Sequence, residues 1–409
     1  MEDRVILHCD CNSFFASVET AMHPEYAGVP MAVCGSTENR HGIVLAKNEL
    51  AKKYGVKTAE TVYAAKKKCP GLLTVPPHHD KYLEYSRRVN EVYAKYTDLI
   101  EPFGIDESWL DVTASQKLFG SGEQIAELIR NDVKKTIGIT VSIGVSFNKV
   151  FAKLGSDYKK PDAITVISRE NYRDIVFPLP ASDLLFIGKK TDMILSSMGV
   201  RTIGDLAATS VDLLRMKMGK MGEMIYRYAR GEDDSPVSPE REDAKSVGNG
   251  FTFRHDLITK EECRVGIDFL SEEIGRRLRS MGMKCSTVQL TIKDDYLRTV
   301  QRQRAINPPT DIAREIAARA YEILLSEWNE GSPVRMLTVT ATNLVHADLA
   351  CEQIDMFSLD DSNSRAKNKK IEEAVDKIRQ KHGWSSVLAG SVIESDIGIY
   401  DYRDSKGEK

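Results

Sequence analysis

The chain lacks any long hydrophobic run, and none of its apolar stretches approaches the about 20 residues that a membrane-spanning helix needs. Its first residues, Met-Glu-Asp-Arg, also lack the pattern of a signal peptide. The seven cysteines are scattered, odd in number and without any Cys-x-x-Cys pair, which excludes a disulfide framework and the usual zinc-finger spacing. We therefore expect a reduced, cytoplasmic protein without a membrane anchor.

A strong excess of either charge is absent too. Over 409 residues the formal net charge is −3, with 42% hydrophobic and 29% charged residues. This balance argues against a protein that coats nucleic acid with its whole surface, although local basic faces remain compatible with DNA binding. The length predicts two to four domains, and no repeat of solenoid period is present.

Three acidic residues stand at the end of, or inside, apolar strand-like segments. Asp10 ends the run at residues 5–9, and Asp106 with Glu107 lies inside the run at residues 103–112. Ionised carboxylates beside the core of a sheet are costly unless a cation neutralises them. Mg²⁺ suits this role because it takes oxygen ligands and uses one or two carboxylates together with substrate phosphates, and a pair of such ions serves nucleotidyl transfer. A merely solvated Asp-Glu pair on an edge strand is the alternative.

The order of elements around these carboxylates predicts an α+β layer. A strand at 5–9 is followed by a helix from Ser13, the carboxylate hairpin, a helix around 125–133 and a strand at 139–145. This is the order of a split βαβ sheet, which places the end of the first strand beside the central hairpin. In the last strand apolar residues alternate with Thr, Ser and Gly, which predicts that it is half-buried.

The rest of the chain predicts two further regions. Short helices follow residue 167, and residues 202–205 have the pattern of a helix capping box. The charged, proline-containing segment 231–245 is typical of a linker. A second α+β unit runs over about 246–344, and a short Lys-rich helix near 366–380 stands in a polar tail.

Basic residues at three places point to phosphates, each with a plainer alternative. Lys160 could meet a triphosphate or be an ordinary surface lysine. Gly188 before a helix, with Lys189 and Lys190, offers backbone N–H groups and charge to a phosphate, or is a solvated helix start. Three arginines separated by even numbers of residues in one strand share a face that could track DNA or form a solvated edge. They are Arg298, Arg302 and Arg304.

Three stretches occur together in the order of one known family. They are HCDCNSFFASVE at 8–19, GIDESWLD at 104–111, and IGVSFNKVFAK at 143–153 with Lys160-Pro161-Asp162 after it. The chain thereby resembles the Y-family translesion DNA polymerases over essentially residues 4–357, and bacterial DNA polymerase IV is the nearest branch. The resemblance implies error-prone, template-directed addition of deoxynucleotides to a primer 3′-end, without a proofreading exonuclease.

The resemblance implies an α+β right-hand polymerase with a split-βαβ palm, small fingers, a helical thumb with a helix-hairpin-helix, and an α+β little finger. Two Mg²⁺ ions would be bound by Asp10, Asp106 and the backbone carbonyl of Cys11, with Glu107 on the ion that activates the primer 3′-hydroxyl. The expected boundaries are 1–22 and 76–166 for the palm, 23–75 for the fingers, 167–231 for the thumb, 232–245 for a linker, 246–346 for the little finger and 347–409 for a tail.

The resemblance also assigns binding roles. Phe15 matches the steric gate that excludes ribonucleotides, and the glycine turn before Lys189 matches the thumb's grip on duplex DNA. The partners would be primer–template DNA, deoxynucleoside triphosphates and a sliding clamp, bound by a monomer associated with the nucleoid. The remaining nucleotide-binding residues are Ser13, Phe14, Ile43, Lys52 and Lys160, and the clamp peptide is Gln353, Ile354, Met356 and Phe357.

Three positions depart from the family pattern. Many polymerase IV relatives contact the triphosphate with a tyrosine and an arginine where this chain has Glu49 and Lys52, a pattern closer to the polymerase V subunit. Glu49 would repel phosphates, and Lys52 replaces an arginine only in part. In the thumb, Phe186 stands where a first glycine is usual.

Two other classes of function remain open. One is a non-catalytic, DNA-bound accessory protein that the clamp recruits, and the other is a palm-type nucleotide cyclase. Loss of a carboxylate would favour the accessory protein, and none is lost here. A cyclase needs neither a thumb nor a clamp peptide, and only a polymerase lengthens a primer.

Overall fold

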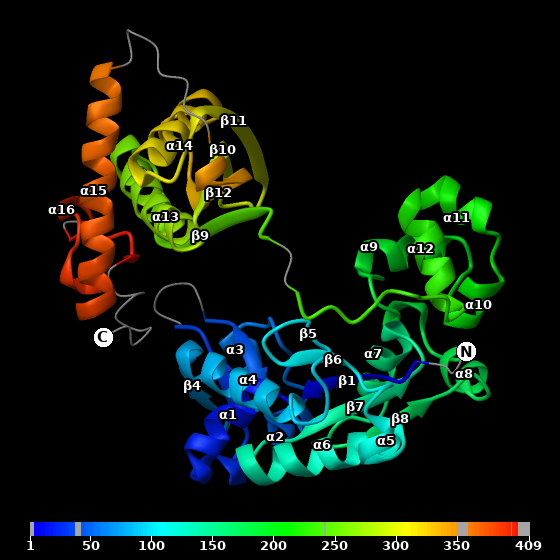
Figure 1. Ribbon diagram of the computed structural model, residues 1–409. Coiled ribbons are helices and arrows are strands. Elements are labelled where there is room, and N and C mark those ends of the chain that lie inside the picture. The colour runs from blue at the N-terminus through cyan, green and yellow to red at the C-terminus, as the bar shows by residue number, and fades with distance from the viewer. Residues whose placement is uncertain (1–3, 37–41, 241–242, 351–358, 394, 400–409) are drawn as a thin grey trace. The chain divides into compact units, whose positions relative to one another are not determined.

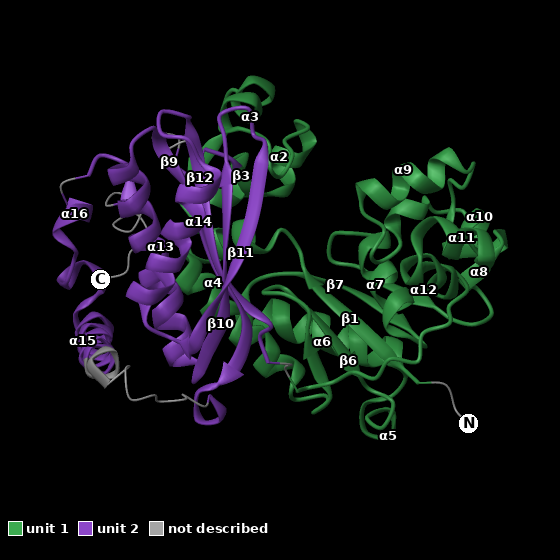
Figure 2. Cartoon of the chain, turned by 90° about the horizontal axis from the view of Figure 1, so that it is seen from above, with its two compact units in different colours: residues 1–33, 44–241 green, residues 34–43, 242–409 purple. Residues whose placement is uncertain are grey.

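The computed structural model describes residues 4–36, 42–240, 243–350, 359–393 and 395–399 (Figure 1). The chain divides into two compact units, one of residues 1–33 and 44–241 and one of residues 34–43 and 242–409 (Figure 2). No helix in the described part of the chain is long and apolar enough to cross a membrane.

A five-stranded sheet with the order β5-β6-β1-β7-β8 forms the centre of the first unit. β1 pairs antiparallel with β6 and with β7, and β8, which the sequence did not predict, lies parallel to β7. The strands are β1 (Ile6–Cys11), β5 (Ile100–Pro102), β6 (Glu107–Asp111), β7 (Val141–Ser146) and β8 (Ile164–Ile167). The helices of this layer are α1 (Phe14–Met22), α4 (His79–Tyr93), α5 (Gln116–Phe119), α6 (Gly122–Ile137) and α7 (Lys149–Tyr158).

The two faces of this sheet pack against different helices. Leu7, Cys9 and Cys11 of β1 join a core with apolar residues of α4 and α6. The residues between them in the strand face α7, which packs closely on β1 and β7. The side of β1 that carries Asp10 is therefore the side of α7.

Helices bury β7 on both faces, which shows that the expectation of a half-buried strand was wrong. Ser142 and Gly144 lie on the face that α7 covers. A Cβ at Gly144 would lie 1.8 Å from the carbonyl oxygen of Ala152 on that helix. Glycine is needed for this close approach, so the small residues of the strand mark a helix contact and not a solvent face.

A small three-stranded sheet, β3-β2-β4, follows α1, and β2 is parallel to β4. Two predicted helices form beside it because a side-chain oxygen caps each of them: Asn48 accepts from the Ala51 N–H and Thr61 from the Ala64 N–H. The elements are η1 (Pro24–Gly28), β2 (Met31–Cys34), β3 (Val44–Lys47), α2 (Glu49–Lys53), α3 (Val62–Lys68) and β4 (Leu73–Val75).

Short helices with their own hydrophobic core complete the first unit. The capping box predicted at residues 202–205 is confirmed, since Thr202 and Asp205 each bond to the other's backbone N–H. Phe186 adopts φ = 68°, a left-handed conformation that favours glycine. The elements are α8 (Tyr172–Val176), η2 (Ala181–Asp183), α9 (Lys189–Ser197), α10 (Ile203–Ala208), α11 (Val211–Met218) and α12 (Lys220–Ala229).

The second unit contains a four-stranded antiparallel sheet with the order β11-β10-β12-β9. Two long helices, α13 and α14, lie side by side (Figure 1) and share a hydrophobic core with the sheet. The elements are β9 (Ser246–Leu257), α13 (Lys260–Ser280), β10 (Met283–Lys293), β11 (Thr299–Thr310), α14 (Ala313–Glu327) and β12 (Val334–His346).

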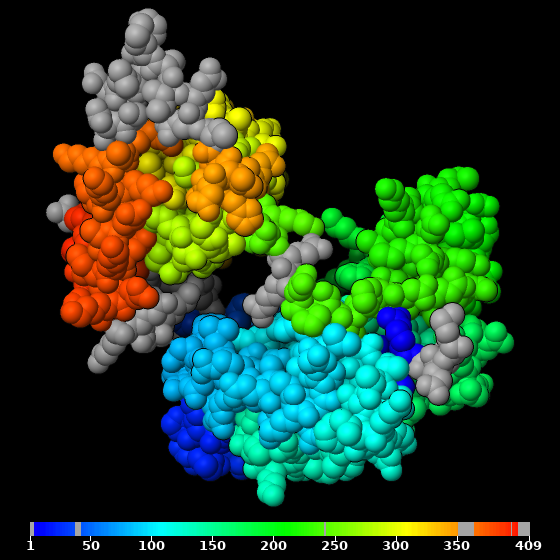
Figure 3. Space-filling view, in the orientation of Figure 1, coloured from blue at the N-terminus to red at the C-terminus, as the bar shows by residue number. Residues whose placement is uncertain are grey.

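Much of the predicted polar tail is folded onto this second unit. It forms η3 (Ala347–Leu349), α15 (Leu359–His382), η4 (Trp384–Ser386) and α16 (Gly390–Ile393), so the helix is longer than the expected 366–380. Trp384 and Val392 belong to the core of the unit. Arg279 of α13 also holds α15 through Glu372 and Asp376, at 2.5 and 2.7 Å. Figure 3 shows α15, in orange, lying against the yellow and green atoms of the same unit.

Candidate active site

The pairing of β1 with β6 places two of the three predicted carboxylates opposite each other. Asp10 stands across from Glu107 in the antiparallel register, and side chains of directly opposite residues share one face with Cβ atoms about 5 Å apart. Asp106 lies just before β6, where its carbonyl oxygen accepts a hydrogen bond of 3.0 Å from the Cys11 N–H. The backbone thus brings the three acidic residues to the same end of β1 and β6.

Burial makes two of these carboxyl groups costly to ionise. Asp10 is 6% exposed, and loss of water raises its pKa to about 6 although the Lys160 ammonium opposes the shift. Burial and the charge of the neighbouring Glu107 raise the pKa of Asp106 as well. The site therefore requires positive charge in order to hold both groups in the ionised form.

Neighbouring side chains already stabilise the ionised form of Glu107. Burial opposes its ionisation, but contacts with His8 and Lys153 outweigh burial and lower the pKa of Glu107 to about 2. The Lys153 Nζ lies 2.5 Å and the His8 Nε2 3.2 Å from Oε2 of Glu107. The His8 ring is fully buried, with its Nδ1 2.8 Å from the Ser156 hydroxyl, and burial lowers its pKa.

α7 and the turn after it supply a row of lysines to the carboxylates. Lys149 and Lys153 are one turn apart in α7, so their side chains leave the same face, and Lys160 lies just after the end of the helix. The three ion pairs are Lys149 with Glu101 at 2.6 Å, Lys153 with Glu107 at 2.5 Å and Lys160 with Asp10 at 2.6 Å. Sequence reasoning singled out Lys160 alone, although the helical spacing of the lysines after the 139–145 strand was a signal for the other two.

The adjacent phenylalanines of α1 have different surroundings. Phe14 is 3% exposed and lies in the core, so only its main chain is left for the predicted nucleotide contact. Phe15 stacks on Tyr82 of α4, with ring centroids 4.1 Å apart and an angle of 12° between the planes. Sequence reasoning did not assign a role to Tyr82.

The two positions that depart from the family pattern in α2 pair with each other. The Lys52 Nζ lies 2.5 Å from Oε1 of Glu49, and the hydroxyl of Ser13 donates to the same oxygen at 3.2 Å. A hollow of about 360 Å³ lies here, lined in part by Ser13, Glu49 and Asp162. Ile43, also predicted to contact nucleotide, is 40% exposed.

The predicted phosphate-binding turn lies at the start of a helix. Gly188 is the N-cap of α9, and Lys189 and Lys190 occupy its first turn. All three are exposed. Exposed N–H groups at a helix start, with two lysines beside them, suit a nucleic-acid backbone.

The structure corrects the reading of the three arginines. Arg298 lies before β11, where its N–H donates to Asp294, so it is not part of the strand. Arg302 and Arg304 do share a face, but the register places them opposite Leu290 and Val288, whose side chains belong to the core. That face is the one that α14 covers, and Glu327 and Glu322 of α14 lie 3.2 and 3.8 Å from Arg302 and Arg304. These residues therefore do not form an unpaired basic strand face.

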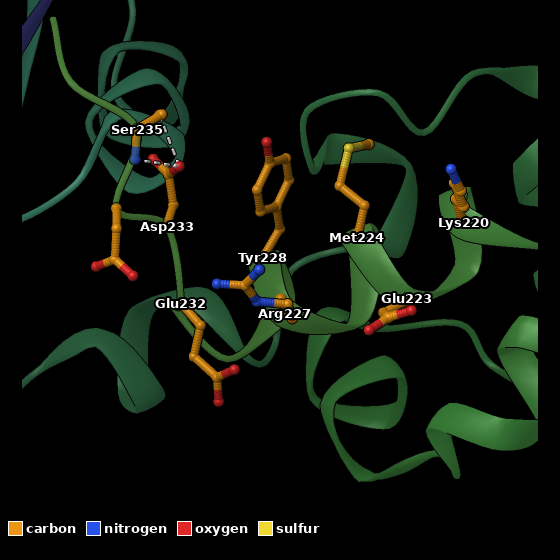
Figure 4. A pocket seen from close by; sticks show the side chains of 9 residues that line it. Lys220, Glu223, Met224, Arg227, Tyr228, Glu232, Asp233 and Ser235 are labelled. Atoms are coloured by element: carbon orange, nitrogen blue, oxygen red, sulfur yellow. Dashed lines mark hydrogen bonds between the residues drawn. The ribbon is translucent and has the colours of Figure 1, made fainter.

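Three remaining observations concern possible metal ligands, a second hollow and the predicted clamp peptide. Among the described residues, no three or more His, Cys, Asp or Glu side chains form a ready-made metal cluster. A separate hollow of about 550 Å³ lies beside α12 and the segment after it, lined by both acidic and basic side chains such as Glu223, Arg227 and Asp233 (Figure 4), and includes no predicted site residue. Gln353, Ile354, Met356 and Phe357 lie outside the described residues.

Known families match three parts of the chain. The impB/mucB/samB family matches residues 9–157, its C-terminal domain matches residues 244–356, and the DNA polymerase-iota thumb domain matches residues 182–233. DNA polymerase IV of Acetivibrio thermocellus is 49% identical over 393 residues, which cover 96% of this chain and 98% of that protein. DNA polymerase IV 1 of Bacillus subtilis is 35% identical over 396 residues, which cover 97% and 94%.

A solved structure shares the fold. It is the Y-family DNA polymerase chimera Dbh-Dpo4(243-245)-Dbh, with a TM-score of 0.74 at 23% sequence identity. The match covers 83% of this chain and 99% of that chain. A match of this length includes parts of both compact units.

Proposed function

This chain belongs to the impB/mucB/samB family of Y-family DNA polymerases and is a DNA-directed DNA polymerase of the translesion type, and we propose that its chemistry is centred on Asp10, Asp106 and Glu107. The observation that carries the proposal is the register of β1 with β6, which places Asp10 opposite Glu107 beside Asp106. The reaction adds deoxynucleotides to a primer 3′-end, and the match with the polymerase family outweighs the accessory-protein alternative.

Y-family polymerases are nucleotidyltransferases that generally require divalent metal ions, and the donor set proposed here fits two Mg²⁺ ions. It consists of carboxylate and carbonyl oxygens, which Mg²⁺ prefers, and Mg²⁺ is usually held by one or two carboxylates with substrate phosphates and not by a complete protein cage. Asp10, Asp106 and the Cys11 carbonyl would hold the ions, with Glu107 on one of them.

The ions, when bound, stabilise charge on the attacking and leaving oxygens. The protein's own contribution is position and compensating charge. Lys153 and His8 hold the Glu107 carboxylate ionised and fixed. Lys160, which here neutralises Asp10, carries a positive charge that can be shared with the triphosphate of the incoming nucleotide.

The nucleotide site extends over α1 and α2. We assign Phe15 as the steric gate against ribonucleotides, because its ring is held against Tyr82 and is only partly buried at the edge of the core, whereas Phe14 lies inside it. Lys52 reaches the triphosphate only by leaving Glu49, its present partner. Ser13, the Phe14 main chain and Ile43 complete the predicted set.

DNA and partner contacts are proposed at further places. The start of α9, with Gly188, Lys189 and Lys190, would hold the phosphates of the primer–template duplex in the manner of a helix-hairpin-helix. Residues 353–357 would bind a sliding clamp, and the enzyme would act as a monomer on the nucleoid. We place the palm at 1–22 and 76–166, the fingers at 23–75, the thumb at 167–231, the linker at 232–245, the little finger at 246–346 and the tail at 347–409.

Replacement of Asp106 by alanine tests the proposed chemistry. We expect Asp106→Ala to abolish primer extension and to leave primer–template affinity within a few-fold of the parent, because a carboxylate that binds cations serves chemistry more than DNA binding. A gel-based extension assay and a fluorescence-anisotropy titration measure the two quantities. Asp98→Ala, at an exposed position of the same region, is the control, and robust extension by Asp106→Ala would reject the assignment.

A further inference from the structure

The ring of Phe15 is held by a group of aromatic residues at the start of α4. Tyr82 is fully buried beneath it and stacks on it at 4.1 Å. The ring of His79 meets Phe15 edge-on, with centroids 5.9 Å apart and an angle of 89°. The position of Phe15 therefore depends on where the tyrosine ring lies.

A buried carboxylate fixes that tyrosine ring. The Tyr82 hydroxyl donates to Oε1 of Glu19 at 2.5 Å, and the ring Nδ1 of His78 lies 2.9 Å from the same oxygen. Glu19 is 1% exposed and stands one turn after Phe15 in α1. Burial, together with the hydrogen bond to Glu19, raises the pKa of Tyr82, so its hydroxyl remains a donor.

These contacts close a loop between two helices. α1 carries both Phe15 and Glu19, and α4 with its N-terminal flank carries Tyr82 and His78. A buried carboxylate is tolerated only with such partners, and charge-assisted hydrogen bonds of this kind are short and directional. The hydroxyl end of Tyr82 is thereby tied to the helix from which Phe15 projects, and the stack fixes the phenylalanine ring in turn.

We propose that Glu19, acting through Tyr82 and supported by His78, is a positioning residue that sets how strongly the enzyme discriminates against ribonucleotides. The inference rests on the proposed role of Phe15 as the steric gate. An aromatic ring excludes a 2′-hydroxyl only while it is held close to the sugar, so loss of the anchor relaxes selection between the two sugars more than it slows incorporation of the correct nucleotide.

The test is the ratio of kcat/KM for a deoxynucleotide to that for the ribonucleotide with the same base. Both substrates meet the same protein, so a general loss of folding or activity cancels in the ratio. We expect Phe15→Ala to remove most of the discrimination. Tyr82→Phe, which keeps the ring and removes only the hydroxyl, should lower the ratio on the order of tenfold, as one lost hydrogen bond can.

A double-mutant cycle separates positioning from a general structural effect. In the Phe15→Ala background, Tyr82→Phe should no longer change the ratio, because the ring that it positions is gone. Glu19→Gln keeps an oxygen that can accept from Tyr82 and should lose less discrimination than Tyr82→Phe. Tyr85→Phe, at another tyrosine of α4, is the matched control and should leave the ratio unchanged.

Two results would overturn the inference. One is a parental ratio in Tyr82→Phe, and the other is an equal effect of that substitution with and without Phe15. If Phe15→Ala itself keeps full discrimination, the assignment of the gate falls and this inference falls with it. If the parent protein does not extend primers, the proposed function fails, which is a different and distinguishable result.

Discussion

Replacing Lys160 by methionine tests whether lysines neutralise the buried carboxylates when no divalent cation is bound. Methionine keeps much of the apolar stem and removes the ammonium. The Lys160 Nζ lies 2.6 Å from Asp10 and 2.8 Å from Asp157, and the side chains of Lys160 and Asp10 are 31% and 8% exposed. Removal of the ammonium therefore affects the buried carboxylate of Asp10 more than the exposed carboxylate of Asp157.

The magnitude follows from this intermediate burial. Removal of one partner from a fully buried ion pair costs about 3–5 kcal/mol, whereas an exposed pair contributes about 0–1 kcal/mol. Because Lys160 is nearly a third exposed and Asp10 can take up a proton, we expect the free energy of unfolding to fall by about 2 kcal/mol in EDTA near neutral pH. A cation that binds Asp10 should restore most of this loss, so Mg²⁺ should stabilise Lys160→Met more than the parent protein.

The pH dependence provides an internal check. Burial raises the pKa of Asp10 from 3.8 to about 6 in the folded protein, so the folded state binds this proton more tightly than the unfolded chain. Its contribution to stability is fully present below pH 3.8 and is lost as the pH rises through about 6. Well below pH 6, Asp10 is protonated in parent and variant alike, and the difference between them should shrink.

Urea denaturation in EDTA and in Mg²⁺, below and above the pKa of Asp10, measures all these differences. Lys159→Met is the matched control, because it removes an adjacent lysine that is exposed. The reasoning would be refuted if Lys160→Met were as stable as Lys159→Met. A destabilisation that is the same at both pH values, or that Mg²⁺ does not reduce, would refute it equally.

Three further changes have calculable outcomes. Gly144→Ala should lower the free energy of unfolding by about 3 kcal/mol in urea denaturation, because the new Cβ would lie 1.8 Å from a backbone oxygen of α7. The control Gly71→Ala, whose new Cβ would have no neighbouring atom within 4 Å, should be nearly neutral. Equal stability of the two variants would contradict the tight packing. Glu49→Ala frees Lys52 and removes a negative charge, so the KM for deoxynucleotides in steady-state primer extension should fall about fivefold, about 1 kcal/mol, and an unchanged KM would argue against this site. Trp384→Ala should lower the free energy of unfolding by about 3 kcal/mol, because the residue is only 7% exposed in the core of the second unit. Thermal or urea unfolding measures this loss, and no change would mean that the tail is not part of that core.

Apolar periodicity predicted the elements that build the site. The short buried run before Asp10 and the run around Glu107 became β1 and β6, and the order of elements predicted that they meet. A pattern of side chains cannot show which helix will cover a strand. Ser142 and Gly144 therefore suggested solvent, where in fact α7 lies.

Residues whose roles depend on tertiary contacts were the ones missed. Tyr82 occupies an ordinary helical apolar position, and only its neighbours Phe15 and Glu19 give it a role. Even spacing showed that Arg302 and Arg304 share a face, but not that the face is the one beside α14. In the tail, Trp384 and the apolar residues after it are too few to form a periodic pattern, so the sequence suggested a polar extension where the structure has a packed layer.

The packed tail has a structural consequence. β12 ends at His346 and α15 begins at Leu359, and both are built into the same folded unit. Detachment of the tail from this unit would therefore uncover the core around Trp384 and Val392.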